Sequence, residues 1–281
     1  MTYGQLYEMG KKELETAGVG EAALGARLLL EFVCRTKRHD LLAHGDRPIA
    51  QEEEKRYREL IGSRASRIPL QHLTGVQEFM GLEFHVGPEA LIPRQDTEIL
   101  VEEVLRELHD GFRILDLCTG SGCILLSLLH YSNGCAGIGT DISARALELA
   151  QKNARMLGEE EAVFLESDLF EKVEGQYEII VSNPPYIRTD VIPTLEEEVR
   201  LHEPLTALDG GGDGLFFYRE IIKKSRDYLC GGGRLYLEIG YDQKDAVTAL
   251  MREAGFGEVT AVSDYAGKDR VVYGTLYSLQ K

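Results

Sequence analysis

An alternation of short apolar segments with amphipathic ones, running from residue 112 to residue 277, constrains the fold more than any other feature. The apolar segments have the length of strands, and the segments between most of them have the three-and-four spacing of helices. Because helical crossovers connect parallel strands, we expect an α/β protein with a doubly wound parallel sheet and a ligand crevice at the carboxyl ends of its strands. The expected strands are 112–117, 135–141, 162–167, 177–182, 233–240, 257–263 and 270–277, and the expected helices are 121–131, 143–157, 214–229 and 242–254. The last two strands have no helix between them, so they should pair antiparallel.

The first quarter of the chain has a different pattern. Residues 1–65 show helical spacing without strand signals, including an expected helix at 22–33 and a charged one at 49–66 that Gly62 should punctuate. Residues 77–87 alternate around a central glycine and predict a short hairpin. We therefore expect a helical domain at 1–75, a β-hairpin linker at 76–90 and the α/β domain at 91–281.

The chain is acidic, with a formal net charge of −16. Residues 1–90 contribute 12 basic and 14 acidic residues, so most of the negative charge lies in residues 91–281. Such a field repels phosphate backbones, so we expect no stable nucleic-acid binding. The five cysteines form no CxxC pair and join no histidine cluster, so we expect neither disulfides nor a metal site, as in a reducing cytoplasm. The sequence also shows no apolar run of membrane-spanning length, so no membrane association is expected.

The first candidate site is DLCTGSG at 116–122, where an expected strand passes through a glycine-containing loop into a helix. Gly120 and Gly122 allow the backbone to approach a ligand more closely than a side chain would. The loop is neither the dinucleotide fingerprint GxGxxG nor a phosphate-binding P-loop, because Cys118 stands at the first glycine position and no Gly-Lys-Ser/Thr follows. An ordinary strand-to-helix turn is the alternative.

Two aspartates end the next two expected strands. Asp141 can accept hydrogen bonds from both hydroxyls of a ribose, and it follows Gly122 at about the separation usual in nucleoside-binding sheets. Alternatively, Asp141 or Ser143 caps the next helix, although Ser143 would suffice as the cap. Asp168 can accept from an adenine amino group with Leu169 against the ring, but an aspartate after a strand is more often a turn residue.

The most specific candidate is Asn-Pro-Pro-Tyr at 183–186, after the expected strand 177–182. The two prolines fix φ and cannot donate a hydrogen bond, so they hold the Asn183 side chain and the neighbouring carbonyls rigidly. The Asn183 side-chain oxygen and the Pro184 carbonyl can accept both hydrogens of an incoming NH2 group, and Tyr186 can cover its flat face. An ordinary loop is the alternative.

This constellation resembles the S-adenosylmethionine-dependent methyltransferases that modify planar nitrogens, whose motif is (Asp/Asn/Ser)-Pro-Pro-(Tyr/Phe). Nearly the whole chain resembles one family among them, HemK/PrmC, which methylates a glutamine side chain in peptide release factors. Further stretches that carry the resemblance are RIPLQHLTGVQEFMGLEF at 67–84, LIPRQDTE at 91–98, HEPLTALDGGGDGL at 202–215, LEIGYDQ at 237–243 and DYAGKDRVV at 264–272. Two positions depart from the family pattern, since Gln95 replaces a usual proline and Cys118 the usual first glycine.

The resemblance implies a Rossmann-like class I S-adenosylmethionine-dependent methyltransferase sheet, a small N-terminal helical domain that docks the substrate, and a hairpin linker. It implies S-adenosyl-L-methionine as cofactor and S-adenosyl-L-homocysteine as its product. The implied cofactor-binding residues are Cys118, Thr119, Gly120, Ser121 and Gly122 at the methionine end, Asp141 at the ribose, Asp168 and Leu169 at the adenine, and Asn183 beside the substrate. The implied glutamine pocket consists of Asn183, Pro184, Pro185 and Tyr186, of which Asn183, Pro184 and Tyr186 are the expected catalytic residues.

The function expected from this resemblance is methyl transfer to the side-chain amide nitrogen (N5) of a glutamine, the GGQ glutamine, in class-I peptide chain release factors, by a cytoplasmic monomer. The alternative is a nucleic-acid exocyclic-amine methyltransferase acting on adenine N6 or guanine N2, because the same pocket would hold such an amine. A third interpretation is a cofactor-binding module without transfer activity. The acidic charge and the LIPRQDTE stretch favour the protein substrate.

Overall fold

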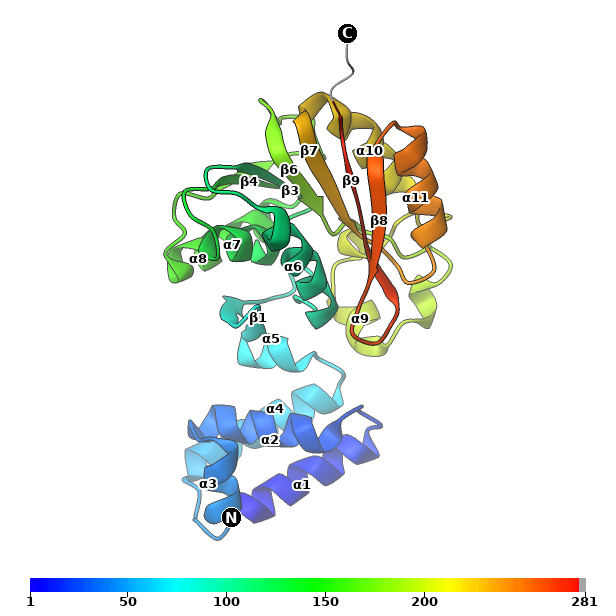
Figure 1. Ribbon diagram of the computed structural model, residues 1–281. Coiled ribbons are helices and arrows are strands. Elements are labelled where there is room, and N and C mark those ends of the chain that lie inside the picture. The colour runs from blue at the N-terminus through cyan, green and yellow to red at the C-terminus, as the bar shows by residue number, and fades with distance from the viewer. Residues whose placement is uncertain (278–281) are drawn as a thin grey trace. The chain divides into compact units, whose positions relative to one another are not determined.

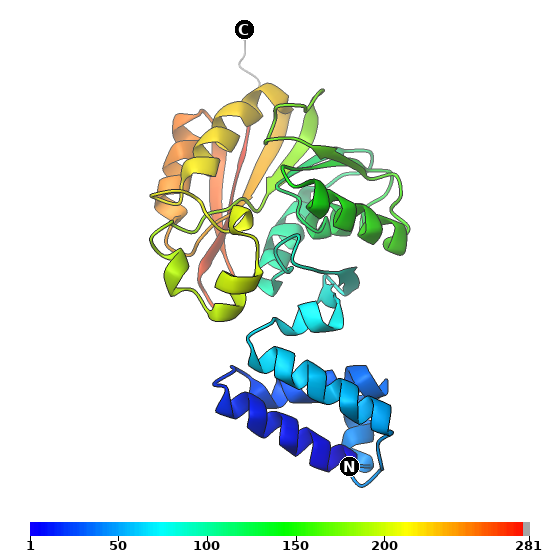
Figure 2. The same cartoon turned by 180° about the vertical axis from the view of Figure 1, so that it is seen from behind.

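The structure of the protein is a computed structural model that describes residues 1–277, seen from opposite sides in Figures 1 and 2. The chain divides into two compact units. The first comprises Met1–Val76 together with Glu196–His202, and the second comprises Gln77–Leu195 and the chain from Glu203 onward. The end of the predicted α/β domain, residues 278–281, lies outside the described residues.

The first unit is helical. Its elements are α1 (Tyr3–Thr16), α2 (Ala22–Cys34), α3 (Arg38–Ala43), α4 (Gln51–Ala65), α5 (Leu70–Thr74) and α9 (Glu197–His202). Leu6, Leu29 and Ile61 are among the fully buried side chains that α1, α2 and α4 share. The prediction that Gly62 punctuates the charged helix was wrong, because α4 continues through it. One glycine costs a helix only about 1 kcal/mol, which the helix-forming residues around it offset.

The short helix α9 joins this unit although it lies far along the chain. Arg64 Nη1 contacts Glu198 Oε1 at 3.0 Å, and Arg67 Nη1 contacts the same oxygen at 3.3 Å. Arg67 also pairs with Glu197 at 3.3 Å. These ion pairs connect α9 to the end of α4 and the turn that follows it. No helix was predicted from the sequence at Glu197–His202.

The second unit is built around a seven-stranded sheet in the order β5-β4-β3-β6-β7-β9-β8 (Figure 1). The strands are β3 (Arg113–Leu117), β4 (Ala136–Asp141), β5 (Val163–Glu166), β6 (Tyr177–Ser182), β7 (Leu229–Glu238), β8 (Gly257–Ser263) and β9 (Asp269–Thr275). Neighbours from β5 to β7 pair parallel, whereas β9 pairs antiparallel with both β7 and β8. The predicted α/β class and the antiparallel final pair are therefore confirmed. The predicted hairpin is also present, as β1 (Val76–Phe79) and β2 (Leu82–His85).

Helices cover both faces of the sheet, as Figures 1 and 2 show from opposite sides. They are α6 (Glu98–Glu107), α7 (Cys123–His130), α8 (Ala144–Leu157), α10 (Phe216–Tyr228) and α11 (Lys244–Glu253), with 3-10 turns at Gln95–Thr97, Ile192–Thr194 and Leu205–Ala207. Successive strand residues enter different cores, so that Ile114 packs with α6 and α7 while Leu115 packs with α10 and α11. Burial of both faces explains why the central strand β6 is almost continuously apolar.

The start of β7 differs from the prediction. The strand expected at 233–240 begins at Leu229 and continues through a run of three glycines. Glycine runs are typical of turns, but here β7 stays paired with β6 through a register shift between Tyr177 and Ile179. Within residues 1–277, no helix is both long enough and apolar enough to cross a membrane.

Candidate functional site

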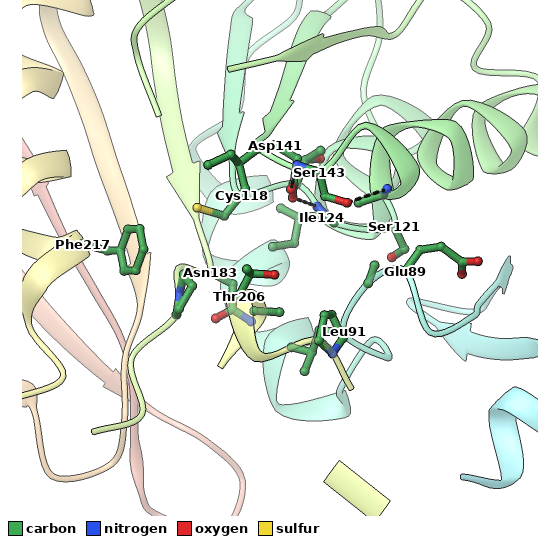
Figure 3. Close-up of a pocket in the computed structure, with 18 of the residues that line it drawn as sticks. Glu89, Leu91, Cys118, Ser121, Ile124, Asp141, Ser143, Asn183, Thr206 and Phe217 are labelled. Carbon is green, nitrogen blue, oxygen red and sulfur yellow. Dashed lines mark hydrogen bonds between the residues drawn. The ribbon is translucent and has the colours of Figure 1, made fainter. Parts of the chain in front are cut away.

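A cavity of about 450 Å³ opens at the carboxyl ends of the parallel strands, within the second unit (Figure 3). The loops after β3, β4, β5 and β6 meet there, together with the segments 89–97 and 204–217. Convergence of these loops follows from the parallel topology, which brings strand ends to the same edge of the sheet. The predicted residues that line the cavity are Cys118, Thr119, Gly120, Ser121, Asp141, Asp168, Leu169, Asn183 and Pro185.

The loop after β3 takes a left-handed backbone conformation at Cys118, where φ is 58°. Residues other than glycine pay about 1–2 kcal/mol for this region, which explains why glycine is usual here. Gly120 is also left-handed, and its backbone faces the cavity. Burial raises the pKa of the Cys118 thiol far above its ordinary value, so this thiol stays protonated. Cysteine is thus accommodated at the cost of backbone strain.

Gly122 lies away from the cavity. A Cβ built there would stand 3.1 Å from both the Ala150 Cβ and the Leu126 Cδ1. Its lack of a side chain therefore serves the packing of α7 against α8, rather than the close approach of a ligand.

Thr119 anchors the same loop to two strands. Its hydroxyl donates to Asp116 Oδ2 at 2.6 Å, and its amide donates to the Thr140 carbonyl at 2.9 Å. Asp116 is fully buried, and burial raises its pKa to about 7. The loop geometry at the cavity is thus fixed by a buried carboxyl group that does not itself line the cavity.

Asp141 connects the ends of β3 and β4. Its Oδ2 accepts from the Gly120 amide at 2.9 Å, and its Oδ1 accepts from the Ser143 amide at 2.9 Å. Ser143 in turn caps α8, accepting from the Ala146 amide at 3.2 Å (Figure 3). Each Asp141 oxygen keeps a further lone pair for a donor in the cavity, and burial raises the pKa of the carboxyl.

Asp168 and Leu169 follow β5. The Asp168 side chain is exposed at the cavity, while Leu169 is buried beneath it in a left-handed conformation with φ of 50°. The Ser167 hydroxyl donates to the Leu169 carbonyl at 3.0 Å and holds this turn. An apolar side chain and a carboxylate thus lie together at the β5 side of the cavity.

Asn183 extends from the end of β6 into the cavity, which Thr206 also lines (Figure 3). Its Nδ2 donates to the Thr97 hydroxyl at 3.4 Å. Pro184 and Pro185 are buried, and Pro185 lines the cavity. Pro184 and Tyr186 are absent from the lining residues, and the Tyr186 side chain packs against the core on the α10 face.

The segment after α9 is attached to the Asn-Pro-Pro-Tyr loop. The Ile187 amide donates to the Leu208 carbonyl at 3.0 Å, and the Gly210 amide donates to the Ile187 carbonyl at 2.8 Å. Glu203 is buried and forms an ion pair with Arg94, which lines the cavity. Burial raises the pKa of Glu203, and the Arg94 charge acts against that rise.

Several side chains that line the cavity were not among the predicted site residues. Thr97 and Arg94 lie in the LIPRQDTE stretch, and Thr206, Phe216 and Phe217 in or just after HEPLTALDGGGDGL. The only signal for them was membership of stretches that resemble a family, because single polar or aromatic residues in loops have no periodicity.

Comparison with known proteins gives matches over most of the chain. Residues 5–75 match the PrmC N-terminal domain model, and residues 94–267 match the methyltransferase small domain model. A release factor glutamine methyltransferase of Agrobacterium fabrum is 43% identical over 93% of this chain and 93% of its own. Another, of Caulobacter vibrioides, is 39% identical over 100% of this chain and 98% of its own. A crystal structure of a methyltransferase from Pyrococcus furiosus shares the fold, with a TM-score of 0.57 and 17% identity over 77% of this chain and 100% of that chain.

Proposed function

Since this chain belongs to the family of release factor glutamine methyltransferases, we propose that it transfers a methyl group from S-adenosyl-L-methionine to the side-chain amide nitrogen (N5) of a glutamine in class-I peptide chain release factors. The observation that best supports this activity is the position of Asn183. Its amide enters the same cavity as Asp141 and the β3 loop, so a nucleoside ligand and a substrate amide would meet there.

The cavity suits S-adenosyl-L-methionine. Its volume lies within the range of about 300–1,000 Å³ usual for small-molecule sites. Asp141 has lone pairs left for two ribose hydroxyls, Asp168 and Leu169 would border the adenine, and Gly120 presents bare backbone to the methionine end. When bound, this cofactor supplies a methyl group on a positively charged sulfur.

Asn183 and Pro184 would orient the substrate amide. The Asn183 side-chain oxygen and the Pro184 carbonyl would each accept one hydrogen of the glutamine NH2 group, which raises electron density on the nitrogen and stabilises positive charge that develops there. Holding the nitrogen about 3–3.5 Å from the methyl carbon gives most of the acceleration. Pro185 would line the glutamine pocket, and Tyr186 would close it from the side of the core.

The transfer is an in-line displacement. The nitrogen lone pair forms the new C–N bond, the C–S bond breaks with its electrons on sulfur, and S-adenosyl-L-homocysteine leaves. The alkylated nitrogen is acidic and loses one proton to water, so no general base among the cavity residues is required.

The helical domain would dock the release factor, and the enzyme would act in the cytoplasm as a monomer. Deleting residues 1–75 should then abolish methylation of the release factor while S-adenosyl-L-methionine still binds. Retained methylation by the shortened chain would contradict the docking role.

A labelling experiment tests the function. The protein is incubated with methyl-labelled S-adenosyl-L-methionine and with a release factor, an RNA or a DNA in parallel. We expect label on the release factor, and Asn183→Ala should reduce single-turnover transfer severely because the half-buried amide matters to the reaction rather than to folding. Label on RNA or DNA alone would favour an exocyclic-amine methyltransferase. The absence of label on the release factor, the RNA and the DNA would favour a cofactor-binding module without transfer activity.

A further inference from the structure

The orientation of the Asn183 amide needs an explanation. Its oxygen must face the substrate for the proposed role, yet the oxygen and nitrogen ends of an amide have nearly the same shape. Only hydrogen-bond partners behind the side chain distinguish the two orientations. The partners must be acceptors, so that the NH2 end turns toward them.

One such acceptor is Thr97, at the end of the 3-10 turn before α6. It is buried, and its hydroxyl oxygen accepts from Asn183 Nδ2 at 3.4 Å. This contact uses one of the two hydrogens on the nitrogen.

A second acceptor is Glu238, at the carboxyl end of β7. Ser182 of β6 is in register with Leu237 of β7, so Asn183 and Glu238 are the next residues on adjacent parallel strands. Glu238 is 2% exposed, and its Oε2 has no hydrogen-bond partner among residues 1–277. A buried acceptor without a partner is costly, so the place of Glu238 next to Asn183 in the strand register is informative.

A positive charge lies behind Glu238. In the antiparallel pair of β7 with β9, Glu238 lies opposite Val271, and Arg270 immediately precedes Val271 in the chain. The Arg270 side chain is 10% exposed and forms ion pairs with Asp96 at 3.0 Å and Asp264 at 3.1 Å. The Arg270 charge favours an ionised Glu238, although no ion pair joins these two side chains among the described residues.

We propose that Thr97 and Glu238 are positioning residues, which accept the two hydrogens of the Asn183 amide nitrogen and so turn its oxygen toward the substrate. This inference rests on the proposed function. It also gives a physical role to three stretches outside the catalytic loop, because Thr97 lies in LIPRQDTE, Glu238 in LEIGYDQ and Arg270 in DYAGKDRVV.

The negative charge of Glu238 favours one orientation of the Asn183 amide over the reversed one. An ionised carboxylate only accepts hydrogen bonds, whereas a protonated one also donates and would tolerate the reversed amide. Burial raises the pKa of Glu238 to about 7, against the opposing effects of Thr97, Arg270 and Asn183. The negative charge of Asp96 acts in the same direction as burial.

Three neutral titratable groups near Glu238, the Tyr186 and Tyr218 hydroxyls and the Cys123 thiol, stay protonated near neutral pH. The pKa of the Tyr186 and Tyr218 hydroxyls is raised well above its ordinary value by burial, and burial raises the pKa of the Cys123 thiol to about 12. Tyr218 donates to the Glu238 backbone carbonyl at 2.9 Å, which fixes the end of β7. Of these four groups, Glu238 is thus the one expected to change charge near pH 7.

Nuclear magnetic resonance tests the arrangement without any substrate. The side-chain NH2 signals of Asn183, assigned by their loss in Asn183→Ala, should titrate with a midpoint near pH 7 in the wild-type protein. The titration should disappear in Glu238→Gln and persist in Glu103→Gln, which changes a buried carboxyl on α6 instead. Signals that ignore pH, or that titrate equally in Glu238→Gln, would overturn the proposal.

Kinetics with a release factor give the second test. Thr97→Val and Glu238→Gln should lower kcat by about tenfold to a hundredfold through misplacement of the nucleophile, with unchanged affinity for S-adenosyl-L-methionine in calorimetry. Thr97→Ser should restore activity, and the wild-type rise of kcat through pH 7 should be absent in Glu238→Gln. Wild-type kcat in Thr97→Val would overturn the proposal.

A wild-type protein that methylates no release factor would refute the proposed function instead, and leave the resonance result standing.

Discussion

Gly122 and Gly158 have nearly the same backbone conformation, with φ of 79° and 78°, but different surroundings. A Cβ on Gly158 meets open space, whereas a Cβ on Gly122 meets Ala150 and Leu126 at 3.1 Å. Substitution of Gly158 therefore tests backbone strain alone, whereas substitution of Gly122 tests backbone strain and packing together. Gly122, which the sequence suggested as a ligand contact, is not among the residues that line the cavity and lies where α7 packs against α8.

We expect Gly158→Ala to cost about 1 kcal/mol in free energy of unfolding, from left-handed strain alone. Gly122→Ala should cost about 1–3 kcal/mol more, because overpacking between α7 and α8 adds to the same strain. Urea unfolding of both variants measures the difference. Equal losses in the two variants would show that the Gly122 contacts relax freely.

Asp141 holds the β3 loop and would also bind the ribose. Asp141→Ala should weaken S-adenosyl-L-methionine binding by about tenfold to a hundredfold, since hydrogen bonds to a charged group contribute about 1.5–3 kcal/mol. Isothermal titration calorimetry measures the affinity, and Asp110→Ala, on an exposed loop, is the matched control. An unchanged affinity in Asp141→Ala would show that Asp141 does not bind the ribose.

At the scale of elements, the sequence predicts the sheet better than it predicts the site. The strand at 177–182 coincides with β6 because a buried apolar run ends at polar Asn183. The start of β7 was missed because its pairing with β6 overrides the turn preference of three glycines. The roles of Thr97 and Glu238 were not predicted because their proximity to Asn183 depends on strand order and register, which local sequence patterns do not specify.

The short helix α9 depends on long-range contacts. Six residues cannot sustain a helix in water, so its ion pairs with Arg64 and Arg67 should stabilise it. Glu198→Gln is expected to increase amide hydrogen exchange in residues 196–202, whereas Glu196→Gln, at an exposed neighbouring position, should leave it unchanged. Exchange that is the same in both variants would mean that apolar contacts alone hold α9.

At the scale of the whole molecule, two fully buried carboxyl groups oppose folding at high pH. Burial raises the pKa of both Asp116 and Glu238 to about 7, while in the unfolded chain such groups ionise near pH 4. A raised folded-state pKa contributes stability that is complete below the unfolded pKa and is lost as pH rises through the folded pKa. Stability should therefore fall between about pH 4 and 7 and level off above that range.

Urea unfolding at pH 5 and pH 8 tests this expectation. The wild-type protein should have the lower free energy of unfolding at pH 8, and Asp116→Asn should reduce the difference because it removes one of the two buried acids. A wild-type protein equally stable at both pH values would show that these groups are solvated.

At this scale, we propose that the molecule is an enzyme that methylates a glutamine amide of a release factor through Asn183. Tandem mass spectrometry of a release factor incubated with S-adenosyl-L-methionine and either the wild-type protein or Asn183→Ala tests it most directly. We expect one added methyl group on a single glutamine side chain with the wild-type protein, and almost none with the variant. A methyl group on another residue type, or equal modification by the two proteins, would contradict it.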